Sequence, residues 1–339
     1  METAHPPRSG TGPKAPSARR SRSHRHRRPP AARSGPRTPG GPARPRRVLP
    51  YLLVAPTVLA LSAVLGYPLV KLFLLSFQDM TRKELFAGTD PPWAGVEQYR
   101  SIFTDGFFWE VVGRTALFTV VCVGLTMGLA MGVAQLLRHV DRWVRVTMTA
   151  VLVAVWAMPI MVASAVFRWL TDTDHGVVNW LLSLLPGVDF TGHHWFANPW
   201  QGFTVIVLVV VWGAIPFAAI TLHAALTQVP AELEEAARVD GARGWKLFRS
   251  VTFPVIKPAF VMVTALMAIW DFGVFNQIWL MRGGTPEKDY YLLGVYSFTE
   301  SFAVNEYSSG AAIAVITVLM LLAGAVVYLR QLLKMGEVE

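Results

Sequence analysis

Six long apolar stretches constrain the fold of this chain more than any other feature of its sequence. They lie near Val48–Phe77, Trp109–Leu137, Val144–Leu170, Phe203–Thr227, Ala259–Met281 and Ser309–Leu333. Each meets or exceeds the roughly 20 residues that a helix needs to cross ~30 Å of hydrocarbon. Since lipid offers the backbone no hydrogen-bond partner, each stretch must satisfy its own polar groups, which favours helices. The sequence therefore predicts an all-α polytopic membrane protein with six transmembrane helices.

Proline and glycine occur inside these apolar stretches. The residues concerned are Pro56, Gly66, Pro68, Pro159, Gly213 and Pro216. In a membrane helix such residues act as kinks or as points of close packing, so we do not expect them to end the spans.

The positive charge of the chain is concentrated at its N-terminus. The net charge is +9, yet residues 1–47 hold 13 Lys and Arg against the single acid Glu2. This segment is rich in Pro, Gly and Ser and has almost nothing apolar to bury, which predicts a disordered Arg/Pro-rich cytoplasmic tail ahead of a six-span domain at 48–339. Nucleic-acid binding is the alternative, but the tail lacks interleaved aromatic residues. Its position directly before a span favours attraction to anionic lipid.

Loop charges indicate the orientation of the spans. With both termini in the cytoplasm, the inner segments carry 23 Lys and Arg and the outer loops carry five. This bias follows the positive-inside rule and predicts a multi-pass plasma-membrane protein with both ends inside.

The inner loop between the fourth and fifth spans, residues 229–258, has the pattern of a helix, a glycine and a second helix. Pro230 suits a first-turn position, and the acids Glu232, Glu234 and Glu235 suit the positive end of a helix. Gly241 can adopt the left-handed conformation that ends a helix. Trp245, Phe248 and Val251 then form an apolar face at three-residue spacing, and Pro254 and Pro258 are expected to redirect the chain into the fifth span. Such a unit suits docking of a soluble partner; the alternative is an interfacial helix lying on the membrane.

This loop carries a spaced motif: Glu235-Ala236-Ala237, three residues, Gly241, nine residues, then Val251-Thr252-Phe253-Pro254. The motif resembles the EAA loop of binding-protein-dependent ABC importer permeases. Val251 and Phe253 stand where that family usually has Ile and Leu, and both keep the apolar character.

Further features resemble the sugar-type, maltose-permease-like branch of that family, in particular its first permease subunit. They are Pro56, Tyr67-Pro68, Ser76-Phe77, Gly95 to Tyr99, Phe103, Asp105, Phe108-Trp109, Gly176, Asn179 and the turn Gly283-Gly284-Thr285-Pro286. The turn lacks one glycine of the family pattern. The resemblance covers residues 48–335 and leaves the tail unmatched.

The resemblance implies a permease subunit in a bacterial plasma membrane that forms half of a sugar or oligosaccharide pathway. It implies four kinds of partner: a second homologous permease, two ATP-binding subunits, an extracytoplasmic solute-binding protein and the lipid bilayer. The sequence has no Gly-x-x-x-x-Gly-Lys-Ser/Thr run, so ATP and Mg²⁺ are expected on the partner subunits, with no cofactor, metal or catalytic residue here and no nucleic-acid partner. The residues expected to couple the chain to the ATPase are Glu235, Ala236, Ala237, Asp240, Gly241, Phe248 and Pro254.

The fifth apolar stretch contains the candidates for contact with cargo. They are Trp270, Asp271, Phe272, Phe275, Asn276 and Gln277. An ionisable residue inside a span is costly unless it faces protein or water, which makes Asp271 a candidate functional residue. Aromatic rings can stack on sugar faces, and Asp and Asn can hydrogen-bond to hydroxyls. The alternative for Asp271 is an interhelical hydrogen bond or internal pair.

Two other classes of function stay open from the residues alone. A self-contained secondary transporter or channel would need charges at mid-membrane or repeated broken helices, for which Asp271 is thin support. A membrane-bound glycosyltransferase could use Asp172 and Asp174, but the motif is short and the chain lacks a sizeable catalytic domain. His175, His193 and His194 show no ligand spacing typical of a metal site.

Overall fold

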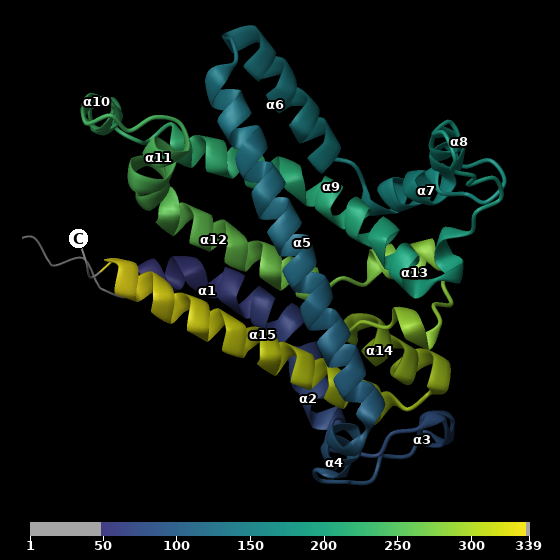
Figure 1. The fold of residues 1–339 in the computed structure, drawn as a ribbon. Coiled ribbons are helices and arrows are strands. Elements are labelled where there is room, and N and C mark those ends of the chain that lie inside the picture. Colours follow the sequence, from purple (N-terminus) through teal and green to yellow (C-terminus); the bar gives the residue numbers. More distant parts are fainter. Residues whose placement is uncertain (1–48, 337–339) are drawn as a thin grey trace, which may run out of the picture. The chain divides into compact units, whose positions relative to one another are not determined.

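The computed structural model describes residues 49–336, and every regular element in that range is a helix (Figure 1). The predicted all-α fold is thus confirmed. The predicted tail, residues 1–47, lies outside the described residues. Residues 57–336 belong to one packed unit, which the following paragraphs concern.

Long helices make up most of the chain, and short helices connect them. In chain order they are α1 (Leu49–Leu61), α2 (Tyr67–Leu75), α3 (Arg82–Ala87), α4 (Glu97–Thr104), α5 (Gly106–His139), α6 (Arg142–Trp156), α7 (Ile160–Leu170), α8 (Val177–Ser183), α9 (Pro199–Leu226), α10 (Ala231–Val239), α11 (Trp245–Leu247), α12 (Phe253–Phe272), α13 (Asn276–Met281), α14 (Leu293–Thr299) and α15 (Tyr307–Gly336). Turns of π-helix at Ser62–Gly66, Phe248–Thr252 and Glu300–Val304 join or extend some of them.

Within the described residues, five helical runs are long and apolar enough to cross a membrane, and a bent pair makes six if it counts as one span. The five runs are Tyr51–Leu75, Gly106–His139, Pro199–Leu226, Trp245–Phe272 and Tyr307–Arg330. The bent pair is Arg142–Trp156 with Ile160–Leu170. These runs correspond to the six apolar stretches of the sequence, with two differences.

The third stretch is broken at Pro159. Its two helices, α6 and α7, meet at an angle of 95°. Proline has no N–H for the helical ladder and disfavours helical geometry in the residue before it, and Pro159 itself adopts φ −58° and ψ 132°. The expectation of a kink within one span understated this break. Pro216, by contrast, lies inside the continuous helix α9, as expected.

The fifth stretch, predicted as Ala259–Met281, is not one helix. Helix α12 ends at Phe272 and α13 begins at Asn276. At this point the N–H of Val274 bonds back three residues to the Asp271 carbonyl (3.4 Å), and Gly273 favours helix poorly, so the ladder stops. The helical run that contains this stretch begins earlier, at Trp245.

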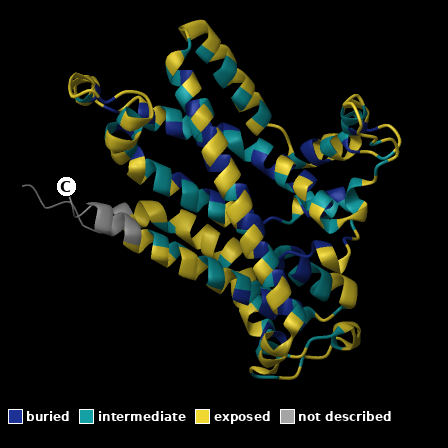
Figure 2. Ribbon diagram, viewed as in Figure 1, coloured by how far each residue is buried: buried dark blue, intermediate teal, exposed yellow. Residues whose placement is uncertain are grey.

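Two apolar clusters pack the helices together. One joins the first half of α5 to α9, α13 and α14, and the other joins the second half of α5 to α9 and α12. Small residues of the second cluster, Ala130 and Ala134 on α5 and Ala218 and Ala219 on α9, are fully buried and let the two backbones approach closely. Figure 2 shows buried residues along α5 and α9, where these clusters lie, and exposed residues over α6 and α10.

Gly310 provides a test of this packing. A Cβ at Gly310 would lie 2.7 Å from the Ser297 carbonyl oxygen and 2.8 Å from the Ser301 nitrogen, and backbone atoms cannot move aside cheaply. We expect Gly310→Ala to lower the free energy of unfolding by about 1–3 kcal/mol. Gly324→Ala is the matched control on α15, where a Cβ meets no atom within 4 Å. Thermal unfolding in detergent measures both; equal unfolding temperatures for the two variants would contradict the prediction.

Candidate functional site

The elbow, which we define as residues 230–254, begins with helix α10. Glu232 and Glu234 lie in the first turn, as the sequence predicts, whereas Pro230 stands one position earlier than predicted, at the N-cap, and Glu235 lies beyond the first turn. The helix ends in a Schellman motif, in which Ala242 N–H donates to the Ala237 carbonyl (2.9 Å) and Gly241 N–H donates to the Arg238 carbonyl (3.1 Å). Gly241 has φ +83°, so the left-handed residue predicted at this position is present.

The second arm of the elbow runs directly into the fifth span. Helix α11, the π-helical turn Phe248–Thr252 and α12 form one continuous helical run. The helix does not break at Pro254 or Pro258, so the prediction that these prolines redirect the chain is wrong. Pro254 closely follows the π-helical turn and Pro258 lies inside α12, and the helical run continues through both.

The residues predicted to couple the chain to a partner lie mostly on the outside of the elbow. Glu235, Ala236, Asp240, Gly241 and Pro254 are exposed, and Ala237 and Phe248 are half-buried. The Phe248 ring stacks on Trp245, with ring centroids 5.3 Å apart.

Two large apolar residues of the elbow are exposed to an unusual degree. Val239 is 87% exposed and Trp245 is 71% exposed, close to the Gly241 turn. Large apolar side chains exposed on both sides of one turn in the chain favour an interaction surface there. Val239 is not among the predicted coupling residues, although an apolar residue at the end of a charged helix is visible in the sequence.

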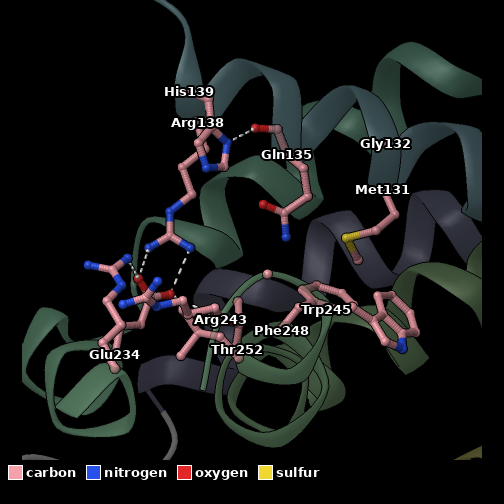
Figure 3. Close-up of a pocket in the computed structure, with 13 residues that line it drawn as sticks. Met131, Gly132, Gln135, Arg138, His139, Glu234, Arg243, Trp245, Phe248 and Thr252 are labelled. Atoms are coloured by element: carbon pink, nitrogen blue, oxygen red, sulfur yellow. Dashed lines mark hydrogen bonds and ion pairs between the residues drawn. The ribbon is translucent and has the colours of Figure 1, made fainter. Parts of the chain in front are cut away.

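Glu234 is the one acid of α10 that faces inward. Its two carboxylate oxygens accept hydrogen bonds from the Arg138 guanidinium at the end of α5 (2.8 and 2.9 Å), and Thr252 Oγ1 donates to one of them (3.0 Å) (Figure 3). Arg238 approaches the carboxylate to 3.6 Å. Burial raises the pKa of Glu234, but the hydrogen bonds from Arg138 and Thr252 and the nearby positive charges outweigh it, so the net pKa is below its ordinary value. From the sequence, Glu234 was predicted to have only a helix-start role, because its partner lies 96 residues away.

A cavity of about 940 Å³ lies between the end of α5 and the second arm of the elbow. Figure 3 shows Arg138 extending along one side of it towards Glu234, with Trp245 on the opposite arm. The remaining lining residues are Met131, Gly132, Gln135, His139, Arg238, Arg243, Gly244, Leu247, Phe248 and Thr252. The cavity thus lies between the end of α5 and part of the second arm, and the Glu234–Arg138 contact lies at its edge.

The cargo candidates do not form one surface. Asp271 is 3% exposed on α12, and its Oδ2 has no hydrogen-bond partner among the described residues. Trp270 is 44% exposed and contacts the Phe217 ring at 5.3 Å. Phe272 packs half-buried against the core, and Phe275 packs against Trp279 and Phe298.

Asn276 and Gln277 belong to a different helix, at the start of α13, where Asn276 is exposed and Gln277 half-buried. The internal pair proposed as the alternative role of Asp271 is not formed at Oδ2 within residues 49–336. The cargo role itself stays a prediction.

The loop after α7 brings acids and a histidine together. Ligand atoms of Asp172, Asp174 and His175 lie within 4.8 Å of one another, all on exposed residues. The Asp172 carboxylate accepts the N–H groups of Asp174 (3.1 Å) and His175 (3.0 Å), which closes the turn. Nearby, the buried Asn179 donates to the His193 carbonyl (2.9 Å) and accepts from Trp195 Nε1 (2.6 Å). These contacts are those of an ordered loop, and the structure places His175 beside two carboxylates, a proximity that the sequence prediction did not include.

Comparison with known proteins identifies the class of molecule. The sequence pattern of the family described as "Binding-protein-dependent transport system inner membrane component" matches residues 124–333. The chain is 39% identical over 297 residues to the diacetylchitobiose uptake system permease protein DasB of Streptomyces coelicolor, covering 88% of this chain and 90% of the relative. It is 32% identical over 286 residues to the sulfoquinovosyl glycerol transport system permease protein SmoG of Agrobacterium fabrum, covering 84% and 90%.

Solved structures agree on the fold. A bacterial ABC transporter involved in the import of the acidic polysaccharide alginate contains a chain that matches with a TM-score of 0.69, at 20% identity, over 84% of this chain and 96% of that one. The relatives are permease proteins, in agreement with the prediction of a permease rather than an enzyme and against a self-contained transporter or channel. From the match to its pattern and from these relatives, the chain belongs to the family of binding-protein-dependent transport system inner membrane components, and it is a permease subunit of such an importer.

Proposed function

We propose that this chain forms half of the membrane pathway for a sugar or oligosaccharide. The named cargoes of relatives support this class: diacetylchitobiose, sulfoquinovosyl glycerol and, for a relative from Thermococcus litoralis, trehalose or maltose. All three carry glycosyl groups rich in hydroxyls. A second, similar permease subunit completes the pathway, and an extracytoplasmic solute-binding protein delivers the cargo. A solved alginate transporter in complex with its oligosaccharide-bound periplasmic protein is consistent with the latter.

The elbow is the proposed docking site for one of two ATP-binding subunits. The observation that carries this proposal is the exposure of Val239 and Trp245 beside the Gly241 turn. Tryptophan contributes strongly to protein interfaces. A protein partner can have a surface that matches the shape of a bent helix pair, whereas a bilayer has no such fixed surface. Because the sequence has no phosphate-binding loop, ATP and Mg²⁺ reside on the partner.

The proposed orientation places both termini and the elbow in the cytoplasm of a bacterial cell. The excess of Lys and Arg in the corresponding loops supports it. The Arg-rich segment 1–47 then faces the anionic inner leaflet, where each basic residue near the surface adds about 1 kcal/mol of attraction.

Cross-linking tests the docking proposal. We expect Val239→Cys, in a Cys122→Ala background, to cross-link to an ATP-hydrolysing subunit in native membranes, because this side chain stands free of its own chain. Phe86→Cys on α3, 76% exposed in a loop assigned to the other side, is the matched control and is expected to give no such product. Cargo uptake that persists while Val239→Cys never captures an ATPase would overturn the assignment. Uptake that survives ATP depletion would overturn the proposed function.

A further inference from the structure

An ion pair between a buried glutamate and a half-buried arginine bridges three helical segments at the elbow. Glu234 on α10 holds Arg138 on α5 through two hydrogen bonds and receives a third from Thr252, in the turn that leads into α12. Its side chain is 8% exposed and that of Arg138 is 26% exposed. The neighbouring acids Glu232 and Glu235 are solvated on the same helix, so α10 turns one carboxylate alone towards the body of the protein.

The need to hold two helices together does not by itself account for this ion pair. Burying two charges is costly, and apolar residues of similar size often hold two segments together as well or better. What a bidentate arginine–carboxylate pair adds is geometry, because two parallel N–H···O bonds fix both distance and orientation.

The surroundings show where this rigidity acts. Helix α10 packs against α11 and the turn Phe248–Thr252, while the cavity of about 940 Å³ separates the second arm of the elbow from α5. The Arg138 side chain runs along this cavity to reach Glu234 (Figure 3). Packed side chains connect α5 to α9 and α12, the helices on either side of the elbow, whereas α10 itself contacts the end of α5 through the ion pair.

We propose that Glu234 and Arg138 are positioning residues that act as a strut, making α5 move as one body with α10 when the ATPase moves the elbow. The inference rests on the proposed function, since it requires an ATPase docked on the elbow. Thr252 extends the strut to α12, so that two core helices follow the same displacement. Coupling through such a link typically changes an equilibrium by about 5–150-fold.

Spin-label distances in the assembled transporter test the strut. One pair of labels, Ala231→Cys on α10 and Leu136→Cys on α5, spans it; a second pair, Leu136→Cys and Val326→Cys on α15, reports movement of α5. All sites are exposed, and Cys122→Ala removes the native thiol. In nanodiscs, with and without Mg-ATP and vanadate, we expect the first distance to stay constant and the second to change.

In Glu234→Gln the first distance should broaden, and the nucleotide-driven change in the second should fall at least twofold, while ATP hydrolysis continues. Arg138→Lys keeps the charge but not the bidentate geometry and should behave in the same way. Thr252→Val should show a smaller effect. Glu232→Gln, on the exposed face, is the matched control and should resemble the unmodified chain.

The outcomes separate the strut from the proposed function. Unchanged distances in Glu234→Gln and Arg138→Lys, in complexes that hydrolyse ATP, would refute the strut and leave the docking proposal standing. A purely structural pair would lower the yield of complex without altering distances in what assembles, which also refutes it. An unmodified chain that binds no ATPase refutes the proposed function and the strut with it.

Discussion

Gly241→Asp is expected to stop transport while the chain remains inserted and folded. Gly241 closes the Schellman motif at φ +83°, and a Cβ built there meets no atom within 4 Å. The substitution therefore creates no clash within the protein; its cost is the left-handed conformation, about 1–2 kcal/mol for a residue with a side chain. The new carboxylate stands on the exposed elbow, between the exposed residues Val239 and Trp245 in the chain, where the proposed docking of the ATPase would bury it without a partner.

Two controls separate this effect from backbone strain. Gly88 has φ +63° and equally open surroundings, but it ends α3, far along the chain from the elbow, so Gly88→Asp should transport normally. Gly241→Asn adds a side chain of similar size without charge and is tolerated in the left-handed region, so it should retain part of the activity. Membrane content and carbohydrate uptake are the measurements. Normal uptake by Gly241→Asp would remove the elbow from the coupling mechanism.

Local rules explain why the elbow was predictable from sequence. Pro230, the acids of the first turn and Gly241 act within a few residues of themselves, and the structure places α10 and its left-handed end where these residues indicate. The spans were predictable for a related reason, since lipid compels an apolar stretch of sufficient length to become a helix.

The parts that sequence reasoning missed depend on residues far apart in the chain or on competition between signals. Glu234 and Arg138 are 96 positions apart, and nothing in either neighbourhood indicates the other. Pro159 and Pro216 both stand in apolar stretches, yet only the first breaks its helix; the two differ in burial, since Pro159 is exposed and Pro216 is buried inside α9. The helix break after Phe272 could not be predicted from composition either, because the sequence stays apolar beyond Phe272 although the helix ends there.

Because of that helix break, the six candidates for contact with cargo do not lie on one helix. Six residues adjacent in sequence predict one lining surface, but Phe272 and Phe275 pack into the protein and Asn276 opens a separate helix. Asp271 is left as the polar candidate on α12, buried against helices that include α5, with an oxygen that no described residue satisfies.

Replacing Asp271 is expected to abolish transport without weakening the fold. A carboxylate in a membrane helix costs up to about 2.5–3.5 kcal/mol on insertion scales, the full cost applying at the helix centre, and a partner normally offsets it. Asp271 lies one residue before the end of α12, but it is buried, so part of this cost applies to it. Since Asp271 Oδ2 has no such partner within residues 49–336, Asp271→Leu should leave the unfolding temperature in detergent unchanged or higher. Asp271→Asn should preserve the shape and lose the charge.

A gain in stability combined with a loss of uptake is the pattern of a residue retained for function. Thr264→Val on the same helix is the control, because its hydroxyl donates only to the Phe260 carbonyl (2.8 Å) within α12, and both stability and uptake should persist. If Asp271→Leu instead lowers the unfolding temperature, the carboxylate serves as an interhelical bond in the assembled protein. If it transports normally, Asp271 lies outside the path of the cargo, and Trp270, exposed one position away, becomes the residue of this helix to test next.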